Sequence, residues 1–100
     1  MDRLAAAREL AERFQCVAVL KGSGTVIAAP GQLLRINPTG NARLATAGTG
    51  DVLAGMIGAR LAAGSSALDA ACAAVWQHGH AADEWPEGIP LRAGRLVFQP

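Results

Sequence analysis

The sequence has little of what disulfide-bonded and zinc-binding domains are built from. Its 100 residues include two cysteines, two tryptophans, two phenylalanines and no tyrosine. Cys16 and Cys72 lie far apart, with no Cys-x-x-Cys pair and no histidine at metal-ligand spacing, which argues against a disulfide framework or a structural zinc site. We therefore expect two buried free thiols in a reducing compartment.

An excess of charge of one sign is also missing. Nine basic and eight acidic residues leave a net charge of +1, so neither a basic nucleic-acid surface nor an acidic tail is indicated. Charged residues interrupt the N-terminal segment where a signal peptide would be apolar, and no later apolar run is long enough to cross a bilayer. The chain is predicted to be cytoplasmic, with no nucleic-acid or membrane partner.

The first third of the chain has the pattern of one helix followed by three strands. Apolar residues recur every three or four positions over residues 4–14, which predicts an amphipathic helix. Residues 17–20 form a short apolar run before a glycine-rich turn, which is typical of a central strand buried on both faces. Residues 25–29 and 33–36 flank Pro30-Gly31-Gln32 and are expected to pair as a hairpin.

The rest of the chain is predicted to form two helices. Residues 49–63 are apolar on nearly all sides, and Gly64 follows as a C-cap. Residues 66–83 show a single apolar stripe, after which irregular chain follows. A three-stranded sheet cannot cover a helix that is hydrophobic all round. The fold class is therefore α/β, and the chain is interpreted as one end of a larger α/β sandwich.

The rings near the second of these helices are interpreted as structural. Trp76 is expected in the core or against the sheet, and Trp85 as a cap over the helix. His78 and His80 are expected to be structural or to face solvent.

A loop of small residues runs directly into the apolar helix at residue 49. Gly48 and Gly50 can adopt backbone angles that other residues avoid. A helix that starts near Asp51 would direct unpaired N–H groups and its positive dipole end into this loop, and phosphate is the expected occupant. Asp51 is then a catalytic base or, in the simpler interpretation, a carboxylate that stabilises the helix start.

Lys21 and Asn41 are further candidates for ligand contacts. Lys21 is the only lysine, and it stands at the end of a predicted strand, where α/β sheets usually bind ligands. The alternative for Lys21 is a surface position at a strand end. The alternative for Asn41 is a turn residue with left-handed backbone angles.

Several motifs occur in one order along the chain. They are residues 19–25 (Val-Leu-Lys-Gly-Ser-Gly-Thr), Gly40-Asn41, residues 45–55 (Ala-Thr-Ala-Gly-Thr-Gly-Asp-Val-Leu-Ala-Gly), His78-Gly79 and Ala81-Ala82-Asp83. Together they resemble the C-terminal part of the ADP-dependent NAD(P)H-hydrate dehydratases, a family of the ribokinase-like superfamily. The resemblance covers about residues 1–85. It implies that residues 1–100 are the C-terminal segment of a three-layer αβα sandwich, with 86–100 a divergent tail.

The resemblance implies a nucleotide-repair lyase. Such enzymes use ADP, or ATP, with Mg²⁺ to return (S)-NAD(P)H hydrate to NAD(P)H, giving AMP and phosphate. In kinase relatives the aspartate after the glycine loop takes a proton from a substrate hydroxyl while loop amides hold the transferred phosphate. By correspondence Asp51 is the catalytic base, and Asp51 and Asn41 contact the hydrate. The nucleotide would be bound by Lys21, Gly22, Ser23, Gly24, Thr25, Gly48, Thr49 and Gly50, and no residue is expected to bind a metal directly.

The resemblance also implies a homo-oligomer, a possible upstream epimerase domain, and a hydrate pocket formed largely by residues that precede this chain. Where the family tends to have Asn-Pro-Gly and Thr-Gly-Gly, the chain has Asn41-Ala42-Arg43 and Thr46-Ala47-Gly48. Arg43 is expected to meet phosphate or to face water. Two other functions stay open: a ribokinase-like kinase of a vitamin precursor, and a non-catalytic nucleotide-binding fragment.

Overall fold

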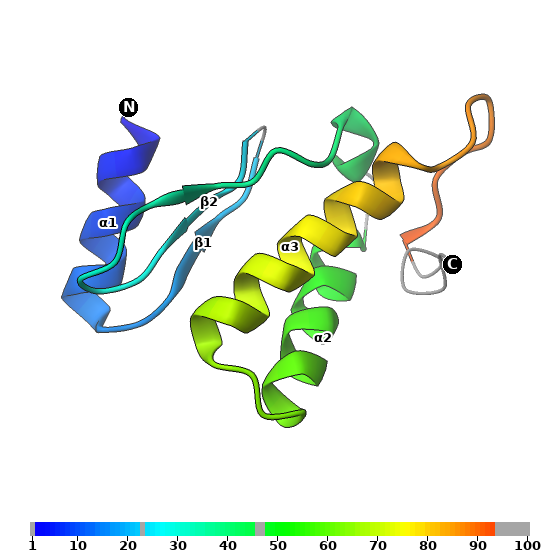
Figure 1. Cartoon of the computed structure of the whole chain (residues 1–100). Coiled ribbons are helices and arrows are strands. Elements are labelled where there is room, and N and C mark those ends of the chain that lie inside the picture. Colours follow the sequence, from blue (N-terminus) through cyan, green and yellow to red (C-terminus); the bar gives the residue numbers. More distant parts are fainter. Residues whose placement is uncertain (1, 23, 46–47, 94–100) are drawn as a thin grey trace.

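In the computed structural model, a three-stranded sheet lies between one helix and a pair of helices (Figure 1). The structure describes residues 2–22, 24–45 and 48–93. In chain order the elements are α1 (Arg3–Phe14), β1 (Ala18–Leu20), β2 (Val26–Ala28), β3 (Arg35–Ile36), a 3₁₀ turn (Ala42–Ala45), α2 (Thr49–Ala62) and α3 (Ala67–Asp83). The order of helices and strands predicted from the sequence is confirmed.

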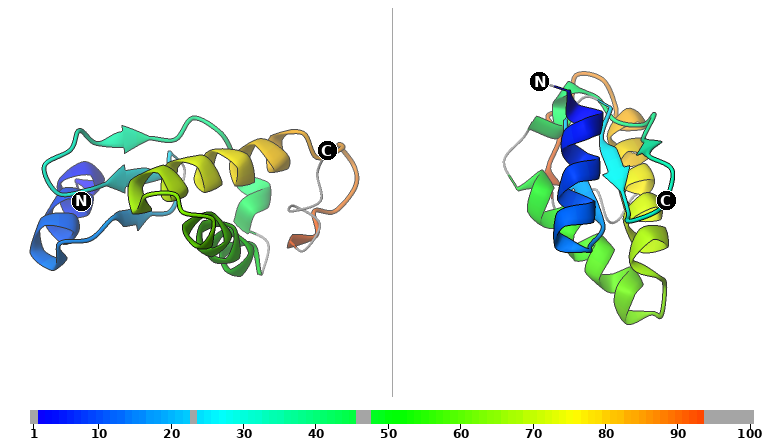
Figure 2. Two further views of the ribbon diagram at one scale, coloured as in Figure 1. Left: turned by 60° about the horizontal axis from the view of Figure 1, so that its bottom comes forward. Right: turned by 90° about the vertical axis from the view of Figure 1, so that its left-hand side faces the viewer.

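Alternating residues of β2 pack on opposite faces of the sheet, as the pleat of a strand requires. Val26 and Ala28 contact Ala7 and Ala11 of α1, whereas Ile27 belongs to the core formed with α2 and α3. The right-hand view of Figure 2 shows α1 in front of the sheet and the other two helices behind it. The described chain is therefore a three-layer αβα arrangement, as expected.

Among the described strands, the strand at residues 17–20 lies at an edge and not between two others, and it is only half-buried. The sheet order is β1-β2-β3 with antiparallel pairing, so β1 lies at an edge of the described strands and is half-buried. The buried central strand is β2, because tight turns on both sides of it place its two sequence neighbours beside it. The predicted hairpin is confirmed, with Val26 paired to Ile36.

The helix ends follow from local capping groups. The Ser66 side chain accepts a hydrogen bond from the Asp69 amide at 3.2 Å and starts α3. Gly48 at the start of α2 and Gly64 just after its end have φ angles of 89° and 101°, which favour glycine. None of the helices in the described part of the chain has the length and apolarity needed to span a bilayer.

The thiols and one tryptophan are less buried than predicted. Cys16 is exposed and Cys72 is partly buried; both are free. Cys16 lies in the link after α1, beyond the packed face of that helix. Trp76 is 47% exposed and stacks on His80, with ring centroids 4.7 Å apart, because the opposite face of α3 supplies the core. The solvent-facing position expected for His80 is confirmed.

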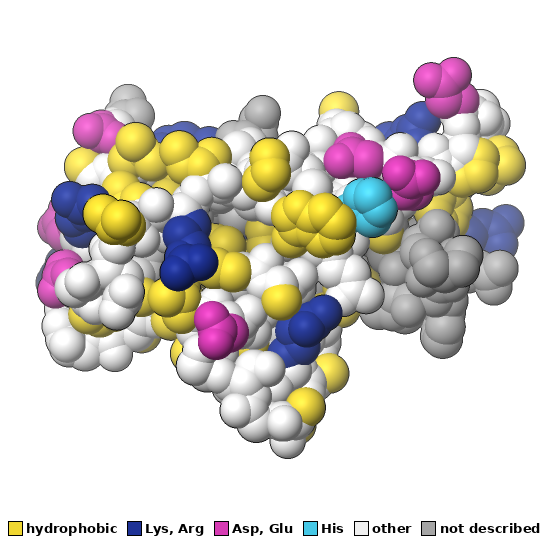
Figure 3. Space-filling view, viewed as in Figure 1, with side chains coloured by type: hydrophobic (Ala, Val, Ile, Leu, Met, Phe, Trp, Pro, Cys, Tyr) yellow, Lys and Arg dark blue, Asp and Glu magenta, His cyan; other side chains and the backbone are white. Residues whose placement is uncertain are grey.

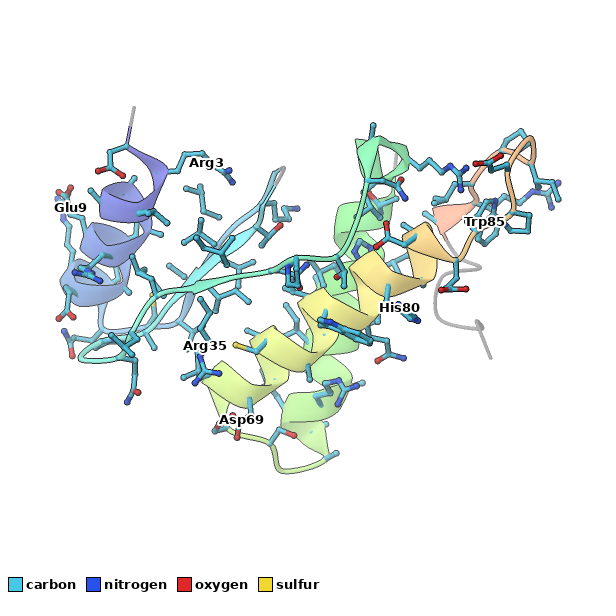
Figure 4. All side chains as sticks on the ribbon, turned by 45° about the horizontal axis from the view of Figure 1, so that its top comes forward. Arg3, Glu9, Arg35, Asp69, His80 and Trp85 are labelled. Atoms are coloured by element: carbon cyan, nitrogen blue, oxygen red, sulfur yellow. The ribbon has the colours of Figure 1, made fainter. Side chains whose placement is uncertain are left out.

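Trp85 packs over the end of α3, as predicted. It is 8% exposed, contacts Ala81, Ala82 and Leu91, and donates its indole N–H to the Ile89 carbonyl at 3.0 Å. Figure 4 shows its ring beyond the last turn of the helix.

Large apolar side chains are exposed on several elements. Figure 3 shows hydrophobic side chains on the face that carries α1, the sheet and α3. The exposed ones are Leu4, Leu10, Phe14, Leu33, Ile36, Leu61, Trp76 and Ile89. This distribution agrees with the prediction that the chain is one end of a larger sandwich.

Candidate active site

A cleft of about 730 Å³ lies where the end of β1, the segment after β3 and the start of α2 meet on α3. Its size is that of a typical small-molecule site. It is lined by Lys21, Gly22, Gly24, Thr25, Ile36, Asn37, Pro38, Thr39, Gly40, Asn41, Ala42, Leu44, Thr49, Gly50, Leu53, Val75, His78 and Gly79.

The cleft brings together most of the residues predicted to form the site. These are Lys21, Gly22, Gly24, Thr25, Asn41, Thr49 and Gly50. Gly48 is the exposed N-cap of α2. Asp51 is exposed in the first turn of α2, next to Gly50, and lies outside the cleft lining formed by the described residues. Ser23 and the loop residues 46–47 lie outside the described part of the chain.

The ammonium group of Lys21 lies against the first turn of α2. A Cβ atom on Gly50 would be 2.7 Å from Lys21 Nζ, so the absence of a side chain at residue 50 leaves room for the ammonium. The first N–H groups of a helix carry partial positive charge. A full positive charge and a helix N-terminus therefore border the same cleft, which is the arrangement that attracts phosphate.

The turn that carries Lys21 is held by α1. Arg3 Nη2 donates to the carbonyl oxygens of Leu20 and Lys21 at 3.2 and 3.3 Å, and Figure 4 shows its side chain extending from α1 toward the strands. The Thr25 hydroxyl donates to the Gly22 carbonyl at 3.2 Å. No local pattern in the sequence indicates Arg3, because its partners lie 17 and 18 residues away.

The start of α2 is held by two hydrogen bonds. The Thr49 hydroxyl donates to the Leu44 carbonyl at 2.6 Å. His78 Nε2 lies 2.9 Å from the Thr49 carbonyl oxygen; because that oxygen only accepts, Nε2 carries the proton. The structural role expected for His78 is therefore confirmed, and its ring also lines the cleft.

The surroundings of the His78 imidazole favour its neutral form. Burial lowers the pKa of His78 below its ordinary value of 6.5, the bond to the Thr49 carbonyl opposes this, and the positive charge of Lys21 lowers the pKa further. With the proton on Nε2, the neutral ring has an unprotonated Nδ1.

Residues 37–41, which follow β3, form a further wall of the cleft and pack against α3. The Thr39 hydroxyl donates to the Trp76 carbonyl at 2.9 Å, and Asn37 Nδ2 donates to the Thr39 carbonyl at 3.0 Å. A Cβ atom on Gly79 would be 2.7 Å from the carbonyl carbon of Thr39. The close approach of this wall to α3 therefore depends on glycine at residue 79.

Asn41 and Arg43 organise the loop that follows. The Asn41 side-chain oxygen accepts a hydrogen bond from the Arg43 amide at 2.9 Å, as in an Asx turn. Asn41 is therefore a turn residue that also lines the cleft, but its φ angle is not positive, so the left-handed backbone angles expected for it are wrong. Arg43 Nη1 donates to the Trp85 carbonyl at 2.6 Å and Arg43 is half-buried. Its guanidinium thus holds the chain after α3 while the side chain stays partly exposed to solvent, and contact with phosphate stays a prediction.

Comparison with known proteins relates this chain to one family. A family model described as NAD(P)H-hydrate dehydratase matches residues 1–93. The chain is 48% identical over 96 residues to the ADP-dependent (S)-NAD(P)H-hydrate dehydratase of Neisseria meningitidis, covering 96% of this chain and 32% of that relative. It is 54% identical over 82 residues to the bifunctional NAD(P)H-hydrate repair enzyme Nnr of Escherichia coli, covering 82% of this chain and 16% of that relative.

A solved structure shares the fold. The crystal structure of the Bacillus subtilis ADP/ATP-dependent NAD(P)H-hydrate dehydratase, co-crystallised with ATP and Mg²⁺, superposes with a TM-score of 0.85 at 40% identity. The superposition covers 97% of this chain and 36% of that one. The chain thus spans about a third or less of the length of these relatives. It belongs to the NAD(P)H-hydrate dehydratase family.

Proposed function

We propose that this chain supplies the nucleotide-binding part and the catalytic carboxylate of an ADP-dependent (S)-NAD(P)H-hydrate dehydratase. The observation that carries the proposal is the contact of the Lys21 ammonium with the first turn of α2 at Gly50, on the edge of a cleft large enough for a nucleotide. Lysine and helix N-terminal amides are two of the groups that bind phosphates most commonly in proteins.

The residues have separate roles in the first half of this reaction. Lys21 and the turn through Thr25 bind the phosphates of the nucleotide, together with the amides of Gly48, Thr49 and Gly50. Asp51 takes the proton from the hydroxyl of the hydrate as the oxygen attacks the terminal phosphorus of ADP. The bond from that phosphorus to the AMP oxygen breaks, and AMP leaves.

The second half of the reaction removes phosphate. The carbon–oxygen bond of the phosphorylated hydrate breaks as the ring nitrogen donates its electron pair, which gives NAD(P)H after loss of a ring proton. The sum is one hydrate and one ADP converted to one NAD(P)H, one AMP and one phosphate. The loop amides stabilise the charge that develops on phosphate in both halves.

Mg²⁺ fits this site as a partner of the nucleotide. Among residues 2–22, 24–45 and 48–93, no three His, Cys, Asp or Glu side chains are grouped to hold a metal ion. Mg²⁺ usually keeps several waters and binds substrate phosphates with few protein ligands. When bound, it would neutralise phosphate charge beside Lys21.

The proposal is tested by hydrate turnover. A version of the protein extended upstream to the length of its relatives, and the 100-residue chain, are incubated with NADH hydrate, ADP and Mg²⁺, and NADH, AMP and phosphate are quantified. The extended protein is expected to form equal amounts of all three. A parallel incubation supplies ATP and a vitamin precursor in place of ADP and hydrate. Formation of the phosphorylated precursor there, with no NADH formed from the hydrate, would instead establish the kinase alternative.

The 100-residue chain tests the third function, a nucleotide-binding fragment. Binding of ADP without turnover, while the extended protein turns over, would show that the chain needs the rest of the hydrate pocket. The proposal includes a cytoplasmic homo-oligomer with a possible upstream epimerase domain. Light scattering on the extended protein measures its assembly state.

A further inference from the structure

Asp83, the last residue of α3, accepts hydrogen bonds from two groups in the segment that follows β3. Its two carboxylate oxygens accept hydrogen bonds from different groups, Oδ2 from the Gly40 amide at 2.9 Å and Oδ1 from Asn41 Nδ2 at 3.0 Å. The two contacts span 43 and 42 residues. Because both bonds go to a carboxylate, they are stronger than bonds between neutral groups.

The position of this carboxylate is unfavourable for α3 itself. The C-terminal end of a helix carries partial negative charge, so an aspartate in the last turn destabilises the helix slightly. The contacts to Gly40 and Asn41 offset this cost. They also fix a backbone conformation that glycine favours, since Gly40 has a φ angle of 104°.

The two sides of the cleft are held by different residues. The phosphate-binding side is positioned by Arg3 and His78. The wall at Gly40 and Asn41 is positioned by Asp83 and rests on α3 at Gly79. Asp83 is not among the described residues that line the cleft, so its effect on a ligand in the cleft is expected to pass through this wall.

We propose that Asp83 is a positioning residue for the hydrate substrate: by fixing the Gly40–Asn41 wall it sets the affinity for the hydrate without taking part in the chemistry. The inference rests on the proposed function and on the hydrate contact that the family resemblance implies for Asn41, which together put the hydrate at this wall and ADP on the opposite side. An asparagine at residue 83 keeps the shape but turns an N–H group toward one of the two donors.

The experiment compares Asp83→Asn with Glu84→Gln in the extended protein. Glu84 is the next carboxylate along the chain and pairs with His80 at 3.9 Å, so its variant removes the same charge from the same helix end. Asp83→Asn is expected to raise the KM for hydrate about tenfold, with kcat and the KM for ADP within about threefold. Glu84→Gln is expected to leave all three within about twofold.

A second measurement is independent of activity. In the 100-residue chain, Asp83→Asn is expected to speed hydrogen exchange of the Gly40 amide and to shift NMR signals of residues 39–42, while those of Lys21 and Gly50 stay in place. Unchanged exchange at Gly40, or a loss in kcat with KM unaltered, would overturn the inference. A wild-type extended protein without dehydratase activity would contradict the proposed function instead, and the exchange of the Gly40 amide would then decide the role of Asp83.

Discussion

Replacing Gly50 by alanine is expected to move stability and nucleotide affinity in opposite directions. The new Cβ would lie 2.7 Å from Lys21 Nζ, whereas ordinary contact begins near 3.4 Å. The ammonium must therefore withdraw by about 0.7 Å, the difference between these distances. Lys21 is exposed and its side chain is flexible, so the folded chain can accommodate this shift at little cost.

The magnitudes follow from the two interactions that change. Alanine is favoured over glycine inside a helix by up to about 1 kcal/mol, so the Gly50→Ala chain should be as stable as the wild type or slightly more stable. A lysine displaced from phosphate loses a charge-assisted hydrogen bond of about 1.5–3 kcal/mol. That loss corresponds to a Kd for ADP about 10- to 150-fold higher.

Two matched controls lie on the same helix. A Cβ atom on Gly55 or Gly58 would meet nothing within 4 Å. Gly55→Ala and Gly58→Ala should give the same gain in stability with no change in ADP binding. Calorimetric titration with ADP and urea unfolding measure the two quantities. An unchanged Kd for Gly50→Ala, or a loss of more than about 1 kcal/mol in stability, would refute the placement of Lys21.

Two further predictions concern α3. Stability should fall as the pH drops through 6.5, because the unfolded chain protonates His78 at its ordinary pKa while burial lowers the pKa of the folded imidazole. The urea unfolding midpoint should therefore depend less on pH in His78→Gln than in the wild type or in the exposed control His80→Gln. An equal pH dependence in all three proteins would contradict this role of His78. Gly79→Ala should cost about 1–3 kcal/mol of unfolding free energy, because its Cβ meets the backbone of Thr39. Gly58→Ala is the control. Equal stability of the two variants would argue against close packing of Thr39 on α3 at Gly79.

Features that depend on neighbouring residues were predictable from the sequence. Helical periodicity and caps such as Ser66 and Gly64 act within one or two turns, so the bounds of α2 and α3 were correct to about a residue. The sequence likewise predicts a phosphate-binding loop at Gly48–Gly50 and a ligand position for Lys21 after a strand, and the resemblance to the family joins the two in one nucleotide site.

Features that depend on distant partners were not predictable. A short apolar run such as residues 17–20 predicts a buried strand but not which strands lie beside it, so the edge position of β1 among the described strands does not follow from the sequence. Arg3, Thr39 and Asp83 reach partners 17 to 43 residues away, and no spacing rule connects such pairs. Trp76 has the spacing of a core residue, yet it lies on the exposed edge of the α3 stripe.

The central claim is that Asp51, at the start of α2, removes the proton that begins hydrate dehydration. Asp51→Asn keeps the shape of the side chain at the helix start but removes the base. In the extended protein it should lower kcat about 100-fold or more, with the Kd for ADP within about twofold. Full dehydratase activity in Asp51→Asn would show that Asp51 is not the base.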